Sequence, residues 1–209
     1  MTRPGLWTRA EKAWRTGGLA GVCRSIAQRA YGHSSAIWHE RDLTTDCPVS
    51  QAYITVRVVM DDLIGTVEWL RSRPHDEREL SLAVARGHLL ARADLPEGPI
   101  ACVKAGWGDV WVADFLCCLR FPSDTAFIYD TYVAPAYRQK GVGRTLLAAV
   151  IEELASRSFR RVFCHIPEWN LASRRLYGSL GFVARRRIRV VRLFSISVLW
   201  PHPKALWSK

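Results

Sequence analysis

The segment from residue 126 to residue 157 constrains the fold most, because it combines a strand pattern, a turn and an amphipathic helix. Residues 126–133 are rich in β-forming side chains, and Pro135, which cannot donate a ladder hydrogen bond, ends the run. Apolar side chains then recur at helical spacing over 142–157. Gly141, just before this run, and Gly143, at its start, let the backbone approach a ligand, and amides at a helix start attract anions. The pattern predicts a phosphate-binding loop.

A second set of residues follows this loop at fixed spacings. Asn170 and Tyr177 are seven residues apart, and Gly181-Phe182 comes next. Together with Val133, Pro135, Arg138, Gly141 and Gly143, these residues match the pattern V-x-P-x-x-R-x-x-G-x-G, then Asn and Tyr, then Gly-Phe. The segment 128–182 therefore resembles the GNAT superfamily of N-acetyltransferases. This resemblance implies a mixed α/β fold, with a mostly antiparallel central sheet flanked by helices, and acetyl-CoA as co-substrate.

The chain divides into three parts by its patterns. Residues 1–50 form a basic, tryptophan-bearing N-terminal extension, residues 51–200 the acetyltransferase domain, and residues 201–209 a tail. Within the extension, 6–31 is predicted as a helix interrupted by Gly17-Gly18, and 36–43 as a strand. A basic helix that carries tryptophans can dock on an anionic membrane surface or a partner, or can pack on the domain with a solvated charged face.

Periodicity and turn residues predict the remaining elements. Helices are expected at 61–71, 74–87, 142–157 and 171–180. Strands are expected at 52–60, 88–93, 100–107, 110–119, 126–133, 161–166 and within 183–199. The apolar run 193–200 is consistent with a buried last strand or with a homodimer interface.

Composition narrows the class of protein. Hydrophobic residues make up 49% and charged residues 23%, as in soluble globular chains, and the net charge of +11 favours anionic partners, among which CoA is one. Charge alone does not identify the partner, and we do not expect a nucleic-acid partner. The six cysteines show no C-x-x-C spacing, so no metal site is expected, and free thiols point to a reducing compartment.

The N-terminus lacks the apolar core of a signal peptide, and we expect a cytoplasmic protein.

The resemblance assigns the residues that hold acetyl-CoA. Amides from Gln139 to Gly143 are expected to bind the diphosphate, the Val133 amide to donate to the thioester oxygen, and Asn170 to lie near the pantetheine arm while it caps a helix. The full expected set is Tyr132, Val133, Arg138, Gln139, Lys140, Gly141, Val142, Gly143, Arg144 and Asn170. The strand that ends at Val133 is expected to bulge and to separate from the strand that ends at Ile166, which leaves a wedge for the cofactor arm.

The resemblance also assigns the catalytic groups. Tyr177 occupies the position that in many family members protonates the departing thiolate. The base that takes the proton of the acceptor ammonium is left open between His165, five residues before Asn170, and Asp130 on the neighbouring strand. Asp114 and Glu68 are weaker candidates.

These assignments leave several functions in competition. The leading hypothesis is transfer of an acetyl group from acetyl-CoA to a primary amine of a small molecule by direct attack. Two alternatives are a macromolecular acceptor, either a protein amine or an aminoacyl-tRNA, and a non-catalytic module that binds CoA or docks on a membrane.

Overall fold

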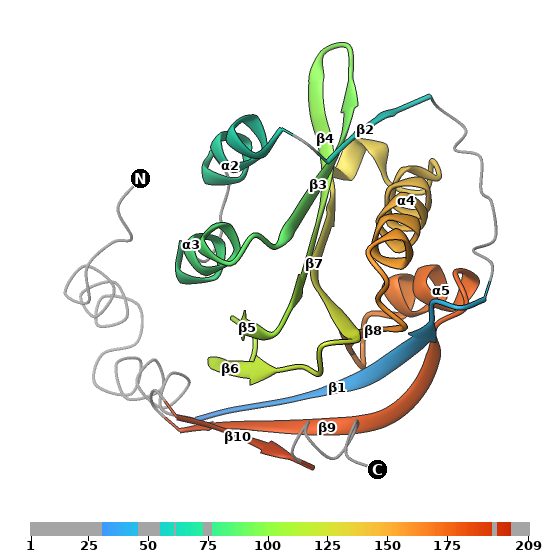
Figure 1. Cartoon of the computed structure of the whole chain (residues 1–209). Coiled ribbons are helices and arrows are strands. Elements are labelled where there is room, and N and C mark those ends of the chain that lie inside the picture. Colours follow the sequence, from blue (N-terminus) through green and yellow to red (C-terminus); the bar gives the residue numbers. More distant parts are fainter. Residues whose placement is uncertain (1–30, 46–54, 61, 73–76, 194–195, 202–209) are drawn as a thin grey trace.

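The computed structural model describes residues 31–45, 55–60, 62–72, 77–193 and 196–201 (Figure 1). The predicted N-terminal helix and most of the predicted tail lie outside these residues. Among the described helices, none is long and apolar enough to cross a membrane.

An eight-stranded sheet in the order β10-β9-β1-β8-β7-β4-β3-β2 forms the framework. Its strands are β1 (Tyr31–Asp42), β2 (Arg57–Val59), β3 (Leu89–Leu95), β4 (Gly98–Trp107), β7 (Thr125–Val133), β8 (Arg161–Pro167), β9 (Val183–Leu193) and β10 (Ile196–Trp200). All neighbours pair antiparallel except β7 and β8, which are parallel. The expected mixed α/β class with a mostly antiparallel sheet is therefore confirmed.

Helices cover the two faces of this sheet (Figure 1). On one face lie α4 (Val142–Ser156) and α5 (Leu171–Ser179), preceded by the short helix η1 (Pro135–Tyr137). On the other lie α2 (Leu63–Arg71), α3 (Glu77–Ala85) and a separate hairpin of β5 (Asp109–Val112) and β6 (Cys117–Arg120). We call these the α4 face and the α3 face.

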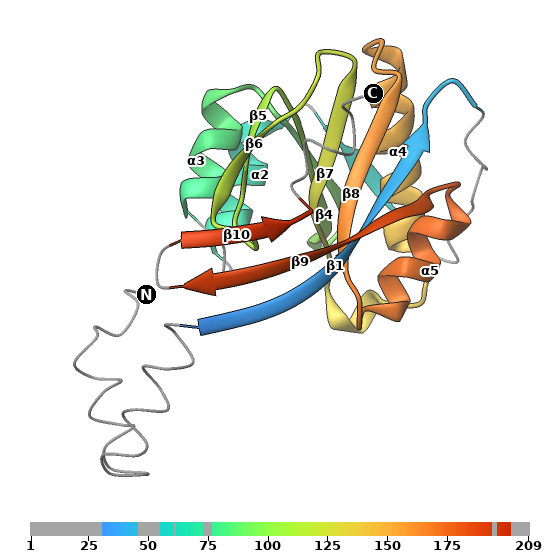
Figure 2. The ribbon, with the colours of Figure 1, turned by 90° about the horizontal axis from the view of Figure 1, so that it is seen from below.

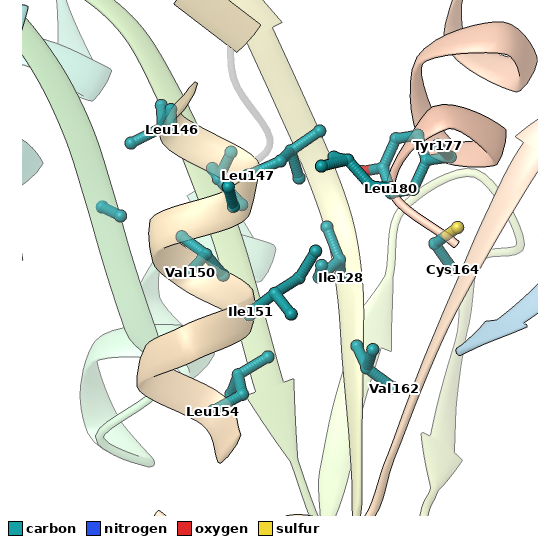
Figure 3. Packing of buried hydrophobic residues seen from close by; sticks show 14 of the residues in the cluster. Ile128, Leu146, Leu147, Val150, Ile151, Leu154, Val162, Cys164, Tyr177 and Leu180 are labelled. Carbon is teal, nitrogen blue, oxygen red and sulfur yellow. The ribbon is translucent and has the colours of Figure 1, made fainter. Parts of the chain in front are cut away.

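Each face carries its own apolar core. On the α4 face, the predicted apolar positions of α4 are buried against β3, β4 and β7 (Figure 3); they are Leu146, Leu147, Val150, Ile151 and Leu154. On the α3 face, Trp38 of β1 is fully buried and stacks on Phe127 of β7 at a centroid distance of 5.2 Å. The sheet is thus fixed from both sides, and the site described below lies where its central pairing stops.

β7 and β8 pair over only part of their length. The parallel register runs from Thr125 opposite Arg161 to Ile128 opposite Cys164, although both strands continue beyond these residues. At the same point the register of β7 with β4 shifts, so that Tyr129 is an extra residue in β7. Beyond the bulge, β7 stays paired to β4 and β8 stays paired to β1. The predicted bulge and wedge are both present, and the strands separate toward Tyr177 (Figure 3).

Two sequence-based expectations need correction. The single strand predicted over 110–119 is wrong: β5 and β6 pair antiparallel, with Val110 opposite Leu119, and the chain turns between them at 113–116. This turn contains no glycine, and Leu116 adopts a left-handed φ of 52°. The strand predicted at 52–60 is described only as β2, from Arg57 to Val59, because residues 52–54 lie outside the described residues.

β1 has a position that its place in the chain does not suggest. It lies between β8 and β9 and pairs antiparallel with both, for example Ile37 with Ile166 and with Arg187 (Figure 2). Residues 31–42, which the sequence analysis placed in the extension, therefore form one strand, β1, of the same sheet as the domain. A separate N-terminal extension stays a prediction for residues 1–30, which lie outside the described residues.

Candidate active site

The loop between η1 and α4 has the backbone of an anion site. Gln139 and Gly141 both have positive φ, 62° and 84°, and Gly141 is the residue before the first turn of α4. No hydrogen bond donated by the backbone amides of Gln139 to Gly143 is found within the described part of the chain. A group of unpaired amides at a helix start, with the positive end of the helix dipole behind them, is suited to a phosphate.

Gly143 sets the distance between this helix start and the end of β7. A Cβ atom added at Gly143 would lie 3.2 Å from Cγ2 of Val133 and 3.5 Å from Cδ2 of Leu176. The first distance is tighter than an ordinary carbon contact, so a side chain at Gly143 would require Val133 to shift by a few tenths of an ångström.

The backbone of Val133 faces the wedge. Ala134 donates its amide hydrogen to the carbonyl of Ile100 at 2.8 Å, so these two residues form a hydrogen-bonded pair of the ladder. Pairs alternate in an antiparallel ladder, and the amide of Val133, opposite Ala101, therefore points away from β4. Arg138 donates from Nε to the Val133 carbonyl at 3.0 Å. The Val133 amide remains directed at the space that β8 has left.

The basic side chains around the loop differ in their surroundings. Arg138 is tied to Val133, and the ammonium of Lys140 lies 5.5 Å from the ring centre of Tyr137. Nε of Arg144 and Oγ1 of Thr145, in the first turn of α4, are buried with no hydrogen-bond partner among the described residues.

Three of the expected CoA-binding residues have structural roles as well. Val142 is buried in the core, so that only its backbone faces the loop. The ring of Tyr132 packs on the α3 face, edge to face with Trp69 at 6.5 Å, and lies away from the diphosphate loop. Asn170 accepts from the amide of Ser173 at 3.1 Å, and this confirms it as the N-cap of α5.

Tyr177 places its hydroxyl at the wedge from the α4 face. Its oxygen lies 2.8 Å from Oγ1 of Thr131 on β7, and its ring meets Phe182 edge to face. Burial raises the pKa of Tyr177 well above its ordinary value, and neighbouring Cys164 and Asp130 add to the shift, while the hydrogen bond with Thr131 opposes it. The hydroxyl is therefore protonated at neutral pH and can act as a proton donor.

His165 and Asp130 both lie on the α3 face, on opposite sides of the wedge. The side chain of His165 is 4% exposed and is enclosed by Phe115 and Phe127, with Nε2 2.9 Å from Oδ2 of Asp114. If Nε2 donates to Asp114, Nδ1 is left as an acceptor, and this buried atom has no partner in the described part of the structure. Asp130 is more accessible, with 40% of its side chain exposed.

Sequence reasoning missed two residues that contact Asp130 or lie beside it. Lys104 of β4 has its Nζ 3.0 Å from Oδ2 of Asp130 and also donates to Glu79 of α3. A signal was available for Lys104, since it is the only charged side chain in the apolar run 100–107. Of the weaker candidates, Asp114 contacts His165, whereas Glu68 is exposed on α2.

Comparison with known proteins decides the family. The acetyltransferase (GNAT) family model matches residues 59–182, more than half of the chain. The chain belongs to the GNAT family of acetyltransferases. GNAT enzymes are N-acetyltransferases that use acetyl-CoA, and the described residues contain no cluster that could hold a metal ion.

The matched relatives agree with this family at two levels. The chain is 37% identical over 59 residues to the ribosomal protein bS18-alanine N-acetyltransferase of Escherichia coli; the match covers 28% of this chain and 40% of that protein. Among solved structures, a GCN5-related N-acetyltransferase from Sphaerobacter thermophilus has 17% identity and a TM-score of 0.57, covering 84% of this chain and 56% of that one. An acetyltransferase from Salmonella typhimurium with its cofactor acetyl-CoA has 21% identity and a TM-score of 0.50, covering 64% and 82%. The structural matches support the fold.

Proposed function

We propose that this GNAT enzyme binds acetyl-CoA across the loop 138–144 and the β7-β8 wedge and transfers the acetyl group to a primary amine. The observation that carries this proposal is the set of unpaired amides at Gln139 to Gly143, adjoining a wedge into which the Val133 amide and the Tyr177 hydroxyl both point. Such a row of donors meets the two needs of a thioester donor, a diphosphate clasp and a hydrogen bond to the carbonyl oxygen.

Each residue has a defined part in this scheme. Acetyl-CoA supplies the activated acetyl group. The Val133 amide stabilises the negative charge that develops on the carbonyl oxygen, and Arg138 holds this strand end by its bond to the Val133 carbonyl. Tyr177 donates its proton to the departing sulfur and regains one of the two protons that the acceptor ammonium loses. Asp130 takes the other proton and passes it to solvent.

The structure favours Asp130 over His165 as the group that meets the acceptor. Asp130 lies on the rim of the wedge and is partly exposed, whereas the imidazole of His165 is enclosed by aromatic rings. His165 keeps a supporting role in our scheme, because its stacking on Phe127 at 5.7 Å fixes the β8 side of the wedge.

The acceptor is a primary amine, and a small-molecule amine stays our first expectation. A protein N-terminal amine is a second candidate, supported by the Escherichia coli relative that is named for acetylating an alanine of a ribosomal protein. Acetylation assays of the same enzyme with small amines and with peptide amines decide between these two acceptors.

The test of the proposal begins with binding. Isothermal titration calorimetry of the full chain should show binding of acetyl-CoA, and S-acetyl-pantetheine, which lacks the diphosphate, should bind at least about tenfold more weakly. Release of free thiol is then followed with amines and with short peptides. Equal affinity for the two thioesters, or the absence of thiol release with every amine, would contradict the proposal.

A further inference from the structure

Three charged side chains from three elements meet on the α3 face beside the wedge. The ammonium of Lys104 on β4 lies between the carboxylates of Glu79 on α3 and Asp130 on β7. The side chains of Lys104 and Glu79 are 3% and 9% exposed, against 40% for Asp130. We call these three residues the acidic cluster, and Asp130 is the member that reaches solvent.

The cluster carries more negative than positive charge. Burial by itself would lower the pKa of Lys104, but Asp130 and Glu79 more than offset it and raise this pKa, so Lys104 is an ammonium at neutral pH. Burial raises the pKa of Glu79 against the attraction of Lys104, and once both carboxylates are ionised the cluster carries one net negative charge. The second oxygen of Glu79, Oε2, accepts from the amide of Ala113 at 3.3 Å, which anchors the cluster to the turn after β5.

The bulge in β7 determines where this charge lies. Because Tyr129 is an extra residue in the strand, Asp130 follows it on the same α3 face, and the next residue, Thr131, points to the α4 face and bonds Tyr177. Asp130 therefore adjoins the part of the wedge that Tyr177 closes from the other side. Its Oδ2 is held by Lys104, while its Oδ1 has no hydrogen-bond partner among the residues that the structure describes.

We propose that Asp130, held by Lys104, binds the acceptor ammonium, and that the net charge of the acidic cluster selects primary amines with no carboxylate beside the amine. This inference rests on the proposed function and adds the class of its acceptor. A free amino acid would bring its carboxylate close to the cluster and be repelled. A peptide N-terminus or an alkylamine brings a cation alone, which neutralises the cluster.

Matched pairs of acceptors test this class. The enzyme is assayed with glycine and glycinamide and with alanine and alaninamide, and the ratio of kcat/KM for the amide to that for the free acid is measured. The amide and the acid also differ in amine basicity, so this ratio is compared between the wild type and its variants, where the difference in basicity cancels. Ethylamine and a short peptide amide then distinguish small amines from peptides as the source of the acceptor.

Two variants change the charge in different ways. Asp130→Asn removes the ammonium partner, and we expect the ratio to fall at least about tenfold, with a raised KM for the amide and an unchanged affinity for acetyl-CoA. Glu79→Gln removes one negative charge but leaves the pair of Lys104 and Asp130, and we expect the same direction of change. Glu152→Gln on the exposed side of α4 is the matched control and should leave the ratio unchanged.

The outcomes separate this inference from the proposed function. A ratio that stays at the wild-type value in both Asp130→Asn and Glu79→Gln would overturn the inference alone. If Asp130→Asn turns over too slowly to measure, Glu79→Gln decides by the same criterion. Wild-type enzyme that binds acetyl-CoA but acetylates none of these amines would contradict the proposed function, and this inference with it.

Discussion

At the residue scale, the surroundings of Tyr177 determine what its hydroxyl can do. The phenol is buried, and burial raises its pKa well above the ordinary value, so it keeps its proton at neutral pH. The protonated phenol lies ready to donate to the departing thiolate, although its raised pKa also makes it a weaker acid than a free tyrosine. Thr131 holds the oxygen in place at 2.8 Å.

We therefore predict that Tyr177→Phe lowers kcat by about 10²-fold or more, with an unchanged Kd for acetyl-CoA, because the proton donor is lost while the binding loop is intact. Stopped-flow or thiol-release kinetics and calorimetry measure the two quantities. Thr131→Val is the matched control: it removes the same hydrogen bond, at a cost of about 1 kcal/mol in unfolding free energy, but retains the phenol and should keep kcat within a few-fold. Equal losses in the two variants would indicate a purely structural role for Tyr177.

A second residue-scale prediction concerns pH. His88 is buried with Nε2 3.2 Å from the carbonyl of Trp107 and Nδ1 3.4 Å from the hydroxyl of Tyr129. Burial lowers the pKa of His88 below 6.5, against the bond to Trp107, so the unfolded chain binds the proton more tightly than the folded one. The stabilisation is complete above pH 6.5 and is lost as the pH falls from there through the lower folded pKa.

Urea unfolding at pH 7.5, 6.5 and 5.5 measures this loss. We expect the wild type to lose unfolding free energy on acidification, and His88→Gln to lose less, because glutamine keeps a donor and an acceptor but has no charge to gain. His39 is also buried with a lowered pKa, so part of the slope should survive in the variant. A slope that is identical in the two proteins would show that His88 does not contribute.

At the scale of elements, the loop before α4 depends on the conformation of its glycines. Gly141 has a φ of 84°, a region that costs a residue with a Cβ roughly 1–2 kcal/mol. Gly143 has an ordinary φ, but an added Cβ would press on Val133. Gly178 in α5 has neither constraint, because an added Cβ would meet no atom within 4 Å.

These three glycines predict different responses to alanine. Gly141→Ala and Gly143→Ala should each raise the Kd for acetyl-CoA several-fold, the first by distorting the amides and the second by displacing Val133. Gly178→Ala should leave this Kd unchanged and stabilise the protein by about 0.5–1 kcal/mol, because alanine is the better helix former. Calorimetry and thermal unfolding provide both readouts, and unchanged affinity in both loop variants would argue against diphosphate binding at this loop.

The loop before α4 and its flanking elements show which parts of the fold can be predicted from the sequence. The strand, loop and helix from 125 to 156 are predictable because their determinants are local: a proline, two glycines and one apolar stripe. The β5-β6 hairpin is not, since its turn at 113–116 has no glycine or proline and Leu116 takes a left-handed φ without a local signal.

The sequence also does not predict the surroundings of the two candidate bases, but for a different reason. His165 is enclosed by Phe115 and Trp38, which are distant from it in the chain, and Asp130 is paired through Lys104 to a helix that precedes it by about fifty residues. Pairings of this kind depend on the order of strands in the sheet, and periodicity carries no information about that order.

At the scale of the whole molecule, β1 connects the beginning of the described chain to its centre. It occupies the space between β8 and β9, so that the β8 side of the wedge is held in place by a strand that precedes the matched family segment 59–182. The wedge can stay open only if β8 keeps a partner after it separates from β7. That partner is β1, which pairs with the separated residues of β8, from His165 opposite Trp38 to Pro167 opposite Ala36. The site therefore needs residues that the resemblance does not include.

This arrangement predicts a large effect for a substitution far from the family motif. Trp38 of β1 is fully buried among Phe127, Phe163 and Phe115, and Trp38→Ala should lower the unfolding free energy by about 3–5 kcal/mol in urea unfolding. Trp200→Ala on β10, whose side chain is 74% exposed, is the matched control and should change it by less than about 0.5 kcal/mol. If the domain began near residue 51, as the sequence alone suggested, both variants would be equally stable. A large loss in Trp38→Ala alone would instead extend the folded domain to include β1, since the removed ring packs on the strand that carries Asp130 and Thr131.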